Sequence, residues 1–77
     1  MRFISENELY KVIGSNIKYY RKLANLTQGE LSELAQISIS YLSKIEAKSC
    51  SKSISIYMLN QLANILNVEI TDFFNAR

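Results

Sequence analysis

Apolar residues recur at steps of three and four along most of the chain, which is the spacing of one face of an α-helix. The first such run consists of Leu9, Ile13, Ile17, Tyr20 and Ala24. Ser5 and Glu8, just ahead of the run, have the spacing of a capping box, which marks a helix start. We therefore expect a helix over residues 6–24, ended by Asn25, because asparagine tolerates the left-handed backbone found after many helices.

Two short helices are predicted next, about three residues apart. Thr27 and Glu30 form a second capping box, and the apolar face that follows consists of Leu31, Leu34 and Ala35. This helix ends near Gln36. Ser38 caps the following helix, whose buried stripe is Leu42 and Ile45 and whose outward residues are Ser40, Ser43 and Lys44. A capped helix, a short turn and a second capped helix form a helix-turn-helix pattern over about residues 27–46.

A polar loop and two further helices complete the pattern. Residues 47–53, with the sequence AKSCSKS, form the loop. Ser55 caps a helix that ends at Asn67 and whose apolar positions are Ile56, Leu59, Leu62, Ala63 and Leu66. Thr71 is expected to cap a last short helix that carries two phenylalanines. The pattern predicts an all-α chain of five helices without strands, folded as a single domain over residues 1–77.

Composition excludes several classes of protein. Two glycines and no proline among 77 residues favour helices, because small all-β folds need turn residues. With no histidine and one cysteine, the chain lacks a metal-ligand set and a Ser-His or Cys-His pair, so we expect neither an enzyme nor a bound cofactor.

The cellular location is predicted from what the chain lacks. Its longest apolar run, residues 56–59, is too short for a membrane helix, and its first residues, MRFISENEL, lack the core of a signal peptide. We therefore expect no membrane association and a cytoplasmic location. Cys50 is then expected to be an inert free thiol, with redox sensing as the alternative.

Positive charge is concentrated in one part of the chain. The formal net charge of +2 is too small by itself to indicate a nucleic-acid partner. However, Lys44, Lys48 and Lys52 cluster at and after the second helix of the helix-turn-helix pattern, whereas the acidic residues toward the two ends are Glu6, Glu8, Glu69 and Asp72. A basic patch at this place suits a phosphate backbone, although three surface lysines also occur by chance.

The sequence resembles the Cro/lambda-repressor-like helix-turn-helix family, also called the XRE family, from about Ile13 to Phe74. The resemblance rests on the segments IGSNIKYYRKLANLTQGELSELAQISISYLSKIEAK and SISIYMLNQLANILNVEITDFF. The family pattern is I-R-x-x-R-x-x-x-G-L-T-Q-x-E-L-A followed by I-S-x-S-Y-L-S-x-I-E. The resemblance implies a compact five-helix bundle of the lambda-repressor-like type and a sequence-specific DNA-binding transcriptional regulator, with a recognition helix at about residues 39–46 in the major groove.

The resemblance places base-reading residues on the outer face of that helix, and these are Ile39, Ser40, Ser43 and Lys44. Lys44 can donate to guanine, Ile39 can contact a thymine methyl group, and the two serines can bind a base or a phosphate. Alternatively, these residues form a solvated helix face, with Ile39 packed against Leu34.

Further DNA contacts implied by the resemblance are made by Thr27, Gln28, Ser38, Tyr41, Lys48 and Lys52. Thr27 and Gln28 begin a helix, where backbone amides and the helix dipole favour a phosphate, and Gln28 would bridge the backbone and DNA. The ring of Tyr41 would lie along the sugar-phosphate wall, and the lysines would contact the backbone without reading sequence. Plain capping by Thr27 and a core position for Tyr41 are the alternatives.

Arg21 and Glu46 occupy positions at which the family joins its first helix to the end of the recognition helix. We expect a bidentate, partly buried salt bridge that fixes the pose of that helix, with an exposed pair of little energetic value as the alternative. The family often has glycine at the position of Gln36, so Gln36 must adopt a left-handed conformation or the turn must differ.

Apolar residues near the C-terminus favour assembly. Ile70, Phe73 and Phe74, with Phe3 and Ile4, exceed what so small a core can hide, so part of this set is expected at the surface of a homodimer. Twofold symmetry would place two recognition helices about 34 Å apart on the double-stranded DNA of a palindromic operator, as in a repressor. The competing hypothesis is a protein-interaction regulator or antitoxin component that binds a regulatory protein partner.

Overall fold

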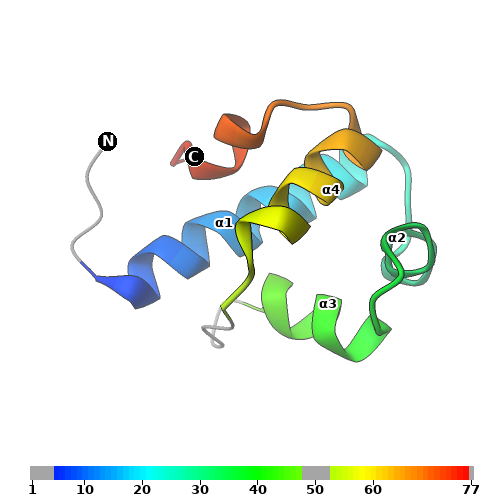
Figure 1. The fold of residues 1–77 in the computed structure, drawn as a ribbon, viewed down its shortest axis with the longest axis horizontal. Helices are drawn as coiled ribbons and strands as arrows, with labels where there is room; N and C mark the ends of the chain where they lie inside the picture. The colour runs from blue at the N-terminus through cyan, green and yellow to red at the C-terminus, as the bar shows by residue number, and fades with distance from the viewer. Residues whose placement is uncertain (1–4, 48–52, 77) are drawn as a thin grey trace.

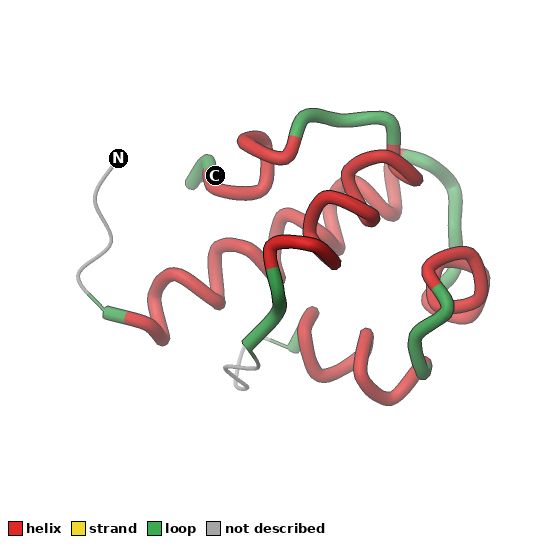
Figure 2. Tube along the Cα trace, viewed as in Figure 1, coloured by secondary structure: helices red, strands yellow, loops and turns green. Residues whose placement is uncertain are grey.

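The computed structural model describes residues 5–47 and 53–76, which form a bundle of helices (Figures 1 and 2). In chain order the elements are α1 (Glu6–Leu23), α2 (Gln28–Ala35), α3 (Ile39–Glu46), α4 (Ile56–Leu66) and the short 3-10 helix η1 (Ile70–Phe74). No strand occurs within these two ranges. The prediction of an all-α fold is therefore confirmed.

Each α-helix begins where the sequence predicts it, because its cap is a local feature. The caps are Ser5, Thr27, Ser38 and Ser55, and in each the hydroxyl oxygen accepts a hydrogen bond of 3.0–3.1 Å from the backbone N–H three residues later. These bonds satisfy backbone donors that the first turn of a helix leaves without an internal partner.

Three helices end at a residue with a left-handed backbone. Asn25, Gln36 and Asn67 have φ angles of 64°, 57° and 59°. After each, the next backbone N–H donates to the carbonyl five residues earlier, as when the N–H of Ile37 donates to Ser32 at 3.0 Å. Of the two possibilities for Gln36, the structure shows the left-handed conformation, at a conformational cost of about 1 kcal/mol for a residue other than glycine.

The predicted count of five helices is not supported, because residues 5–47 and 53–76 form four α-helices and one short 3-10 helix. Thr71 lies inside η1 rather than at its cap. The backbone N–H of Glu69, which precedes η1, donates to the Asp72 carboxylate at 3.0 Å. Isolated 3-10 segments are short because their hydrogen bonds are poorly aligned, so packing against the bundle must hold η1 in place.

A buried asparagine on α1 fixes η1. Asn16 is 1% exposed, and its side-chain nitrogen donates to the carbonyl oxygens of Phe73 at 2.8 Å and Asn75 at 2.7 Å. The Phe73 side chain is fully buried in the core, so the prediction that it contributes to a dimer surface is wrong. Ile70 and Phe74 are partly buried and keep some surface accessible to solvent.

The hydrophobic core draws on every helix of the described chain. Its members are Ile13, Ile17, Leu31, Leu42, Ile45, Leu59, Leu62, Ala63, Leu66 and Phe73. Most of the apolar residues predicted from periodicity therefore pack together, but the prediction is wrong for Ala24, Leu34 and Ile56, which are exposed. None of the helices in residues 5–47 and 53–76 has the length and apolar character needed to cross a bilayer.

The backbones of α1 and α3 are in close contact at Gly14. A β-carbon built on Gly14 would overlap the backbone carbonyl oxygen of Ile45, so no side chain fits at this position. The absence of a side chain lets the C-terminal end of α3 lie directly on the middle of α1. This contact sets the distance of α3 from the rest of the bundle.

Candidate nucleic-acid interface

The outer face of α3 is accessible to solvent. Leu42 and Ile45 point into the core, whereas the exposed residues of this helix are Ile39, Ser40, Ser43 and Lys44. Figure 1 shows α2 nearly end-on and α3 from the side, so the two helices cross steeply. The four residues predicted to read bases thus share one exposed face, and its position depends on what holds α3 against α1 and α2.

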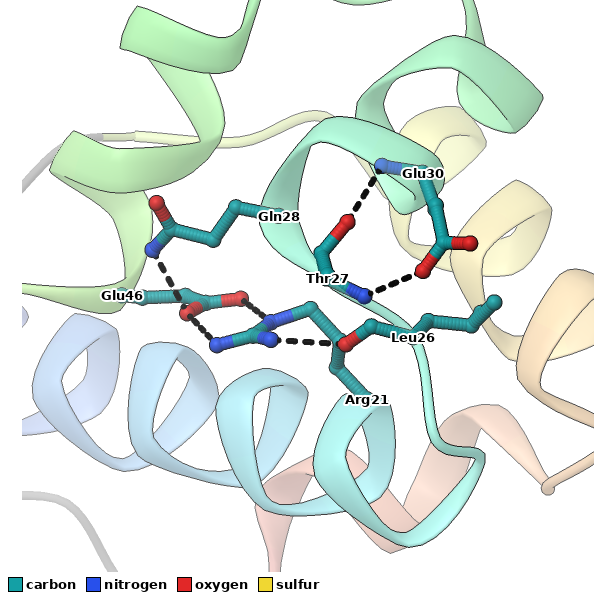
Figure 3. Close-up of polar contacts among 6 residues, drawn as sticks. All are labelled: Arg21, Leu26, Thr27, Gln28, Glu30 and Glu46. Atoms are coloured by element: carbon teal, nitrogen blue, oxygen red, sulfur yellow. Dashed lines mark hydrogen bonds and ion pairs between the residues drawn. The ribbon is translucent and has the colours of Figure 1, made fainter.

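A buried ion pair holds the C-terminal end of α3. The Nε and Nη2 atoms of Arg21 on α1 donate to the two carboxylate oxygens of Glu46 at 2.8 and 2.9 Å, and the two side chains are 8% and 2% exposed (Figure 3). The remaining Arg21 nitrogen, Nη1, donates to the carbonyl oxygen of Leu26 at 2.8 Å. The structure thus contains the bidentate pair expected from the family, and Arg21 also fixes the turn between α1 and α2.

Gln28, the first residue of α2, also bonds to this ion pair. Its side-chain nitrogen donates to Glu46 Oε1 at 3.0 Å. The amide oxygen of Gln28 points away from Glu46 (Figure 3). One carboxylate therefore joins three elements, because Glu46 belongs to α3, Arg21 to α1 and Gln28 to α2. The N-terminus of α2 is consequently held at a fixed position relative to the outer face of α3.

A complete capping box forms the start of α2. The backbone N–H of Glu30 donates to the Thr27 hydroxyl at 3.0 Å, and the backbone N–H of Thr27 donates to the Glu30 carboxylate at 2.8 Å (Figure 3). Because the Thr27 hydroxyl accepts in this bond, it can still donate its own proton outward. The first amides of α2 and the positive end of its dipole point in the same direction, which suits an anion.

Ser38 and Tyr41 make contacts within the protein. The Ser38 hydroxyl accepts from the backbone N–H of Tyr41 at 3.0 Å. The ring of Tyr41 is half-buried against the core, and its hydroxyl donates to the carbonyl oxygen of Ser53 at 3.2 Å. Tyr41 therefore joins α3 to the segment that leads into α4, and Ser38 serves as a cap.

Lysines on α1 add positive charge that was not predicted from the sequence. Lys11, Lys18 and Lys22 are exposed, and their spacing from Gly14 places all three on the side of α1 that meets α3. Their helical spacing was visible in the sequence, but the direction of that face depended on the contact at Gly14. Lys44 is exposed on α3, whereas the predicted backbone contacts Lys48 and Lys52 lie outside the described residues, as does Cys50.

The other apolar residues on the surface are spread over several elements. Leu23 on α1 is 65% exposed, and Ile56 and Tyr57 at the start of α4 are 76% and 71% exposed. Sequence periodicity placed Ile56 on the apolar face of its helix. However, Ile56 is the first residue of α4 and does not pack in the core. Phe3 and Ile4 lie outside the described residues.

The short helices α2 and α3 cross at a large angle, and the outer face of α3 is exposed. This arrangement defines a helix-turn-helix domain. A family model described as helix-turn-helix matches residues 17–73. The chain therefore belongs to the XRE-type, or Cro/lambda-repressor-like, helix-turn-helix family of DNA-binding transcription regulators.

Individual relatives agree with this assignment. The transcriptional regulator SinR of Bacillus licheniformis is 35% identical over 66 residues, which are 86% of this chain and 59% of SinR. The chain thus spans 59% of the length of that relative. A crystal structure of SinR, the master regulator for biofilm formation, in complex with DNA superimposes with a TM-score of 0.73 at 35% identity and covers 82% of this chain and 98% of that chain. A SinR/SinI complex gives the same TM-score and identity over 82% of this chain and 60% of that chain.

Proposed function

We propose that this domain acts as a sequence-specific transcriptional regulator that binds double-stranded DNA as a homodimer, with α3 in the major groove of a palindromic operator. The observation that carries the proposal is the exposed outer face of α3 on a fold that matches the DNA complex of SinR. Bound over a promoter, such a dimer represses transcription by blocking polymerase.

The network around Glu46 gives this proposal a mechanism. The N-terminus of α2, with Thr27 and Gln28, binds a backbone phosphate, and α3 reads bases beside it. The hydrogen bond from Gln28 to Glu46 fixes the distance between these two contacts. Arg21 holds the same carboxylate against α1, so the phosphate anchor and the reading face move as one unit.

The exposed side chains are then of two kinds, those that contact base edges and those that contact the phosphate backbone of DNA. Lys44 donates to guanine, and Ser40 and Ser43 bind bases or phosphates. Lys18, on the face of α1 next to α3, contacts the phosphate backbone, as do Lys48 and Lys52. Backbone contacts of this kind supply affinity, while contacts to base edges supply specificity.

The proposed homodimer uses apolar surface near the C-terminus. Ile70 and Phe74 contribute to it, because η1 leaves both partly accessible. For both copies of α3 to bind one face of the duplex, the twofold axis must place them about 34 Å apart, which is one turn of the duplex. Light scattering on the purified protein checks this: a monomeric mass throughout the micromolar range contradicts the homodimer.

Selection of binding sites from a randomised duplex pool tests the proposal as a whole. At about 150 mM salt we expect enrichment of a twofold motif whose half-sites are about ten base pairs apart. A single half-site without symmetry would support DNA reading but contradict the dimer. A pool that stays random would contradict sequence-specific binding altogether.

Replacing Lys44 by alanine is expected to weaken binding to the selected site by about 1–3 kcal/mol while changing binding to random DNA less. Lys18→Ala is the matched control, because it also removes one exposed lysine. It should weaken both DNAs alike and lower the slope of log affinity against log salt by about 1. Fluorescence anisotropy over a salt series measures both effects, and equal losses for Lys44→Ala on the two DNAs would show that Lys44 does not read a base.

A second candidate function is regulation through a protein partner. The supporting observations are the likeness to the SinR/SinI complex and the exposed apolar pair Ile56 and Tyr57. If this is the function, no DNA sequence should be enriched in the selection experiment, and a stable complex with another protein should be recovered from the source cells. The double variant Ile56→Ser with Tyr57→Ser should no longer form that complex, and its DNA binding should be unchanged.

A further inference from the structure

We infer that Ile39 reads the 5-methyl group of a pyrimidine in the major groove, so that the affinity of this domain for DNA responds to cytosine methylation. The inference rests on the proposed function, since it requires α3 to lie in the groove. It goes beyond the proposed function, because it assigns the preference at one base position to Ile39 and extends that preference to methylated cytosine.

The position of Ile39 carries the inference. It is the first residue of α3, and the residue is 54% exposed although its side chain is fully aliphatic. Its Cδ1 atom lies 3.8 Å from the point where Gly29 would carry a β-carbon, and the Thr27 hydroxyl oxygen lies 3.8 Å from the same point. The tip of Ile39 is therefore next to the end of α2 that is proposed to anchor a phosphate.

The Ile39 side chain keeps much of its surface open to solvent, since the residue is 54% exposed. Gly29 has no side chain that could shield it. The nearby hydroxyl groups of Thr27 and Ser38 accept backbone hydrogen bonds within their own caps. At this end of α3 the surface thus presents an apolar group to the groove, at a position fixed by the network around Glu46.

An apolar group in this position distinguishes pyrimidines by their methyl group. Thymine exposes its 5-methyl group in the major groove, whereas cytosine has a hydrogen at that carbon and purines present the acceptor N7. Contact with isoleucine buries the methyl group, and it leaves a purine acceptor without a partner. Cytosine methylated at carbon 5 presents the same methyl group as thymine, so it should be bound in the same way.

Removal of single methyl groups from the DNA tests the inference directly. In the selected duplex, each thymine is replaced in turn by deoxyuridine, which lacks the methyl group and keeps the Watson–Crick pairing. At one thymine in each half-site we expect the wild-type protein to lose about four-fold in affinity, equivalent to about 0.8 kcal/mol for one buried methyl group. At that position, 5-methylcytosine should bind about four-fold more tightly than cytosine.

The variants Ile39→Ala and Leu23→Ala show whether Ile39 is responsible. Ile39→Ala should bind thymine and deoxyuridine equally at the sensitive position. Leu23 is 65% exposed and lies nine residues after Gly14, on the side of α1 opposite α3. Leu23→Ala removes a similar exposed side chain and should keep the full wild-type response, and circular dichroism confirms that both variants are folded.

Two results would overturn the inference. One is a selected motif in which no thymine responds to loss of its methyl group, and the other is an Ile39→Ala variant that keeps the response. Both leave the proposed function standing, because the protein still selects a motif. If no sequence is enriched in the selection experiment, the proposed function itself is contradicted. Failure of the inference and failure of the proposed function therefore give different results.

Discussion

Replacing Gly14 by alanine is expected to destabilise the domain by about 3 kcal/mol, whereas the same change at Gly29 is expected to stabilise it by about 0.5 kcal/mol. Both glycines lie in α-helices and neither has a positive φ. Helix propensity therefore favours alanine at both positions. The opposite signs come entirely from what the added β-carbon meets.

The surroundings of the two glycines differ in kind. At Gly14 the β-carbon would overlap the carbonyl oxygen of Ile45, which is backbone and cannot rotate away. The helices α1 and α3 would have to move apart, which disturbs the packing of Ile45 and the nearby ion pair. At Gly29 the nearest atoms are Cδ1 of Ile39 and the hydroxyl oxygen of Thr27, both at the ordinary contact distance of 3.8 Å.

Urea unfolding followed by circular dichroism measures both free energies of unfolding. The Gly29→Ala variant serves as the control for helix propensity, because it makes the same chemical change in a helix without the overlap. A Gly14→Ala variant as stable as the wild type would show that α1 and α3 are not locked at this contact. Because α3 is displaced, Gly14→Ala should also lose affinity for the selected DNA under conditions where it is still folded.

The helices were predictable because their signals are local. Ser5, Thr27, Ser38 and Ser55 each act on the first turn of their own helix, and α1 ends within one residue of the predicted position. The final element was not predictable in the same way. Its geometry depends on Asn16, which lies on α1, 57 residues before Phe73 in the chain. Periodicity cannot report a contact of that sequence separation.

The candidate site shows the same division. The exposed face of α3 follows from its three- and four-residue spacing, so Ser40, Ser43 and Lys44 could be assigned to it from sequence. The pairing of Arg21 with Glu46 has no local signal, and it was available only through the family pattern. The role of Gln28 as a partner of Glu46 was missed, because an amide beside a cap offers several possible partners and the sequence does not choose among them.

Replacing Glu46 by glutamine is expected to destabilise the domain by about 3 kcal/mol, because the Arg21 charge remains buried without a counter-charge. The carboxylate accepts three hydrogen bonds, two from Arg21 and one from Gln28. A glutamine side chain offers one oxygen and directs its NH2 group at one of these donors. The measurement is the free energy of unfolding in urea at neutral pH.

Glu30→Gln is the matched control for this prediction. Glu30 is exposed, and its carboxylate accepts a single bond from the Thr27 backbone N–H. Glutamine can make the same bond in a capping box, so the change should stay within about 0.5 kcal/mol. If Glu46→Gln costs no more than Glu30→Gln, the buried pair does not hold α3 in place.

The double variant Arg21→Met with Glu46→Leu distinguishes two roles of Glu46, which are its contribution to stability and its positioning of α2. Replacing both members of a buried pair by apolar residues of similar size removes the unpaired charge, so most of the lost stability should return. DNA binding should not return with it. Gln28 would lack its acceptor on α3, and the phosphate anchor at the start of α2 would no longer be tied to the reading face. A double variant that is stable and binds the selected DNA as well as the wild type would contradict the role of Glu46 as the link between the two.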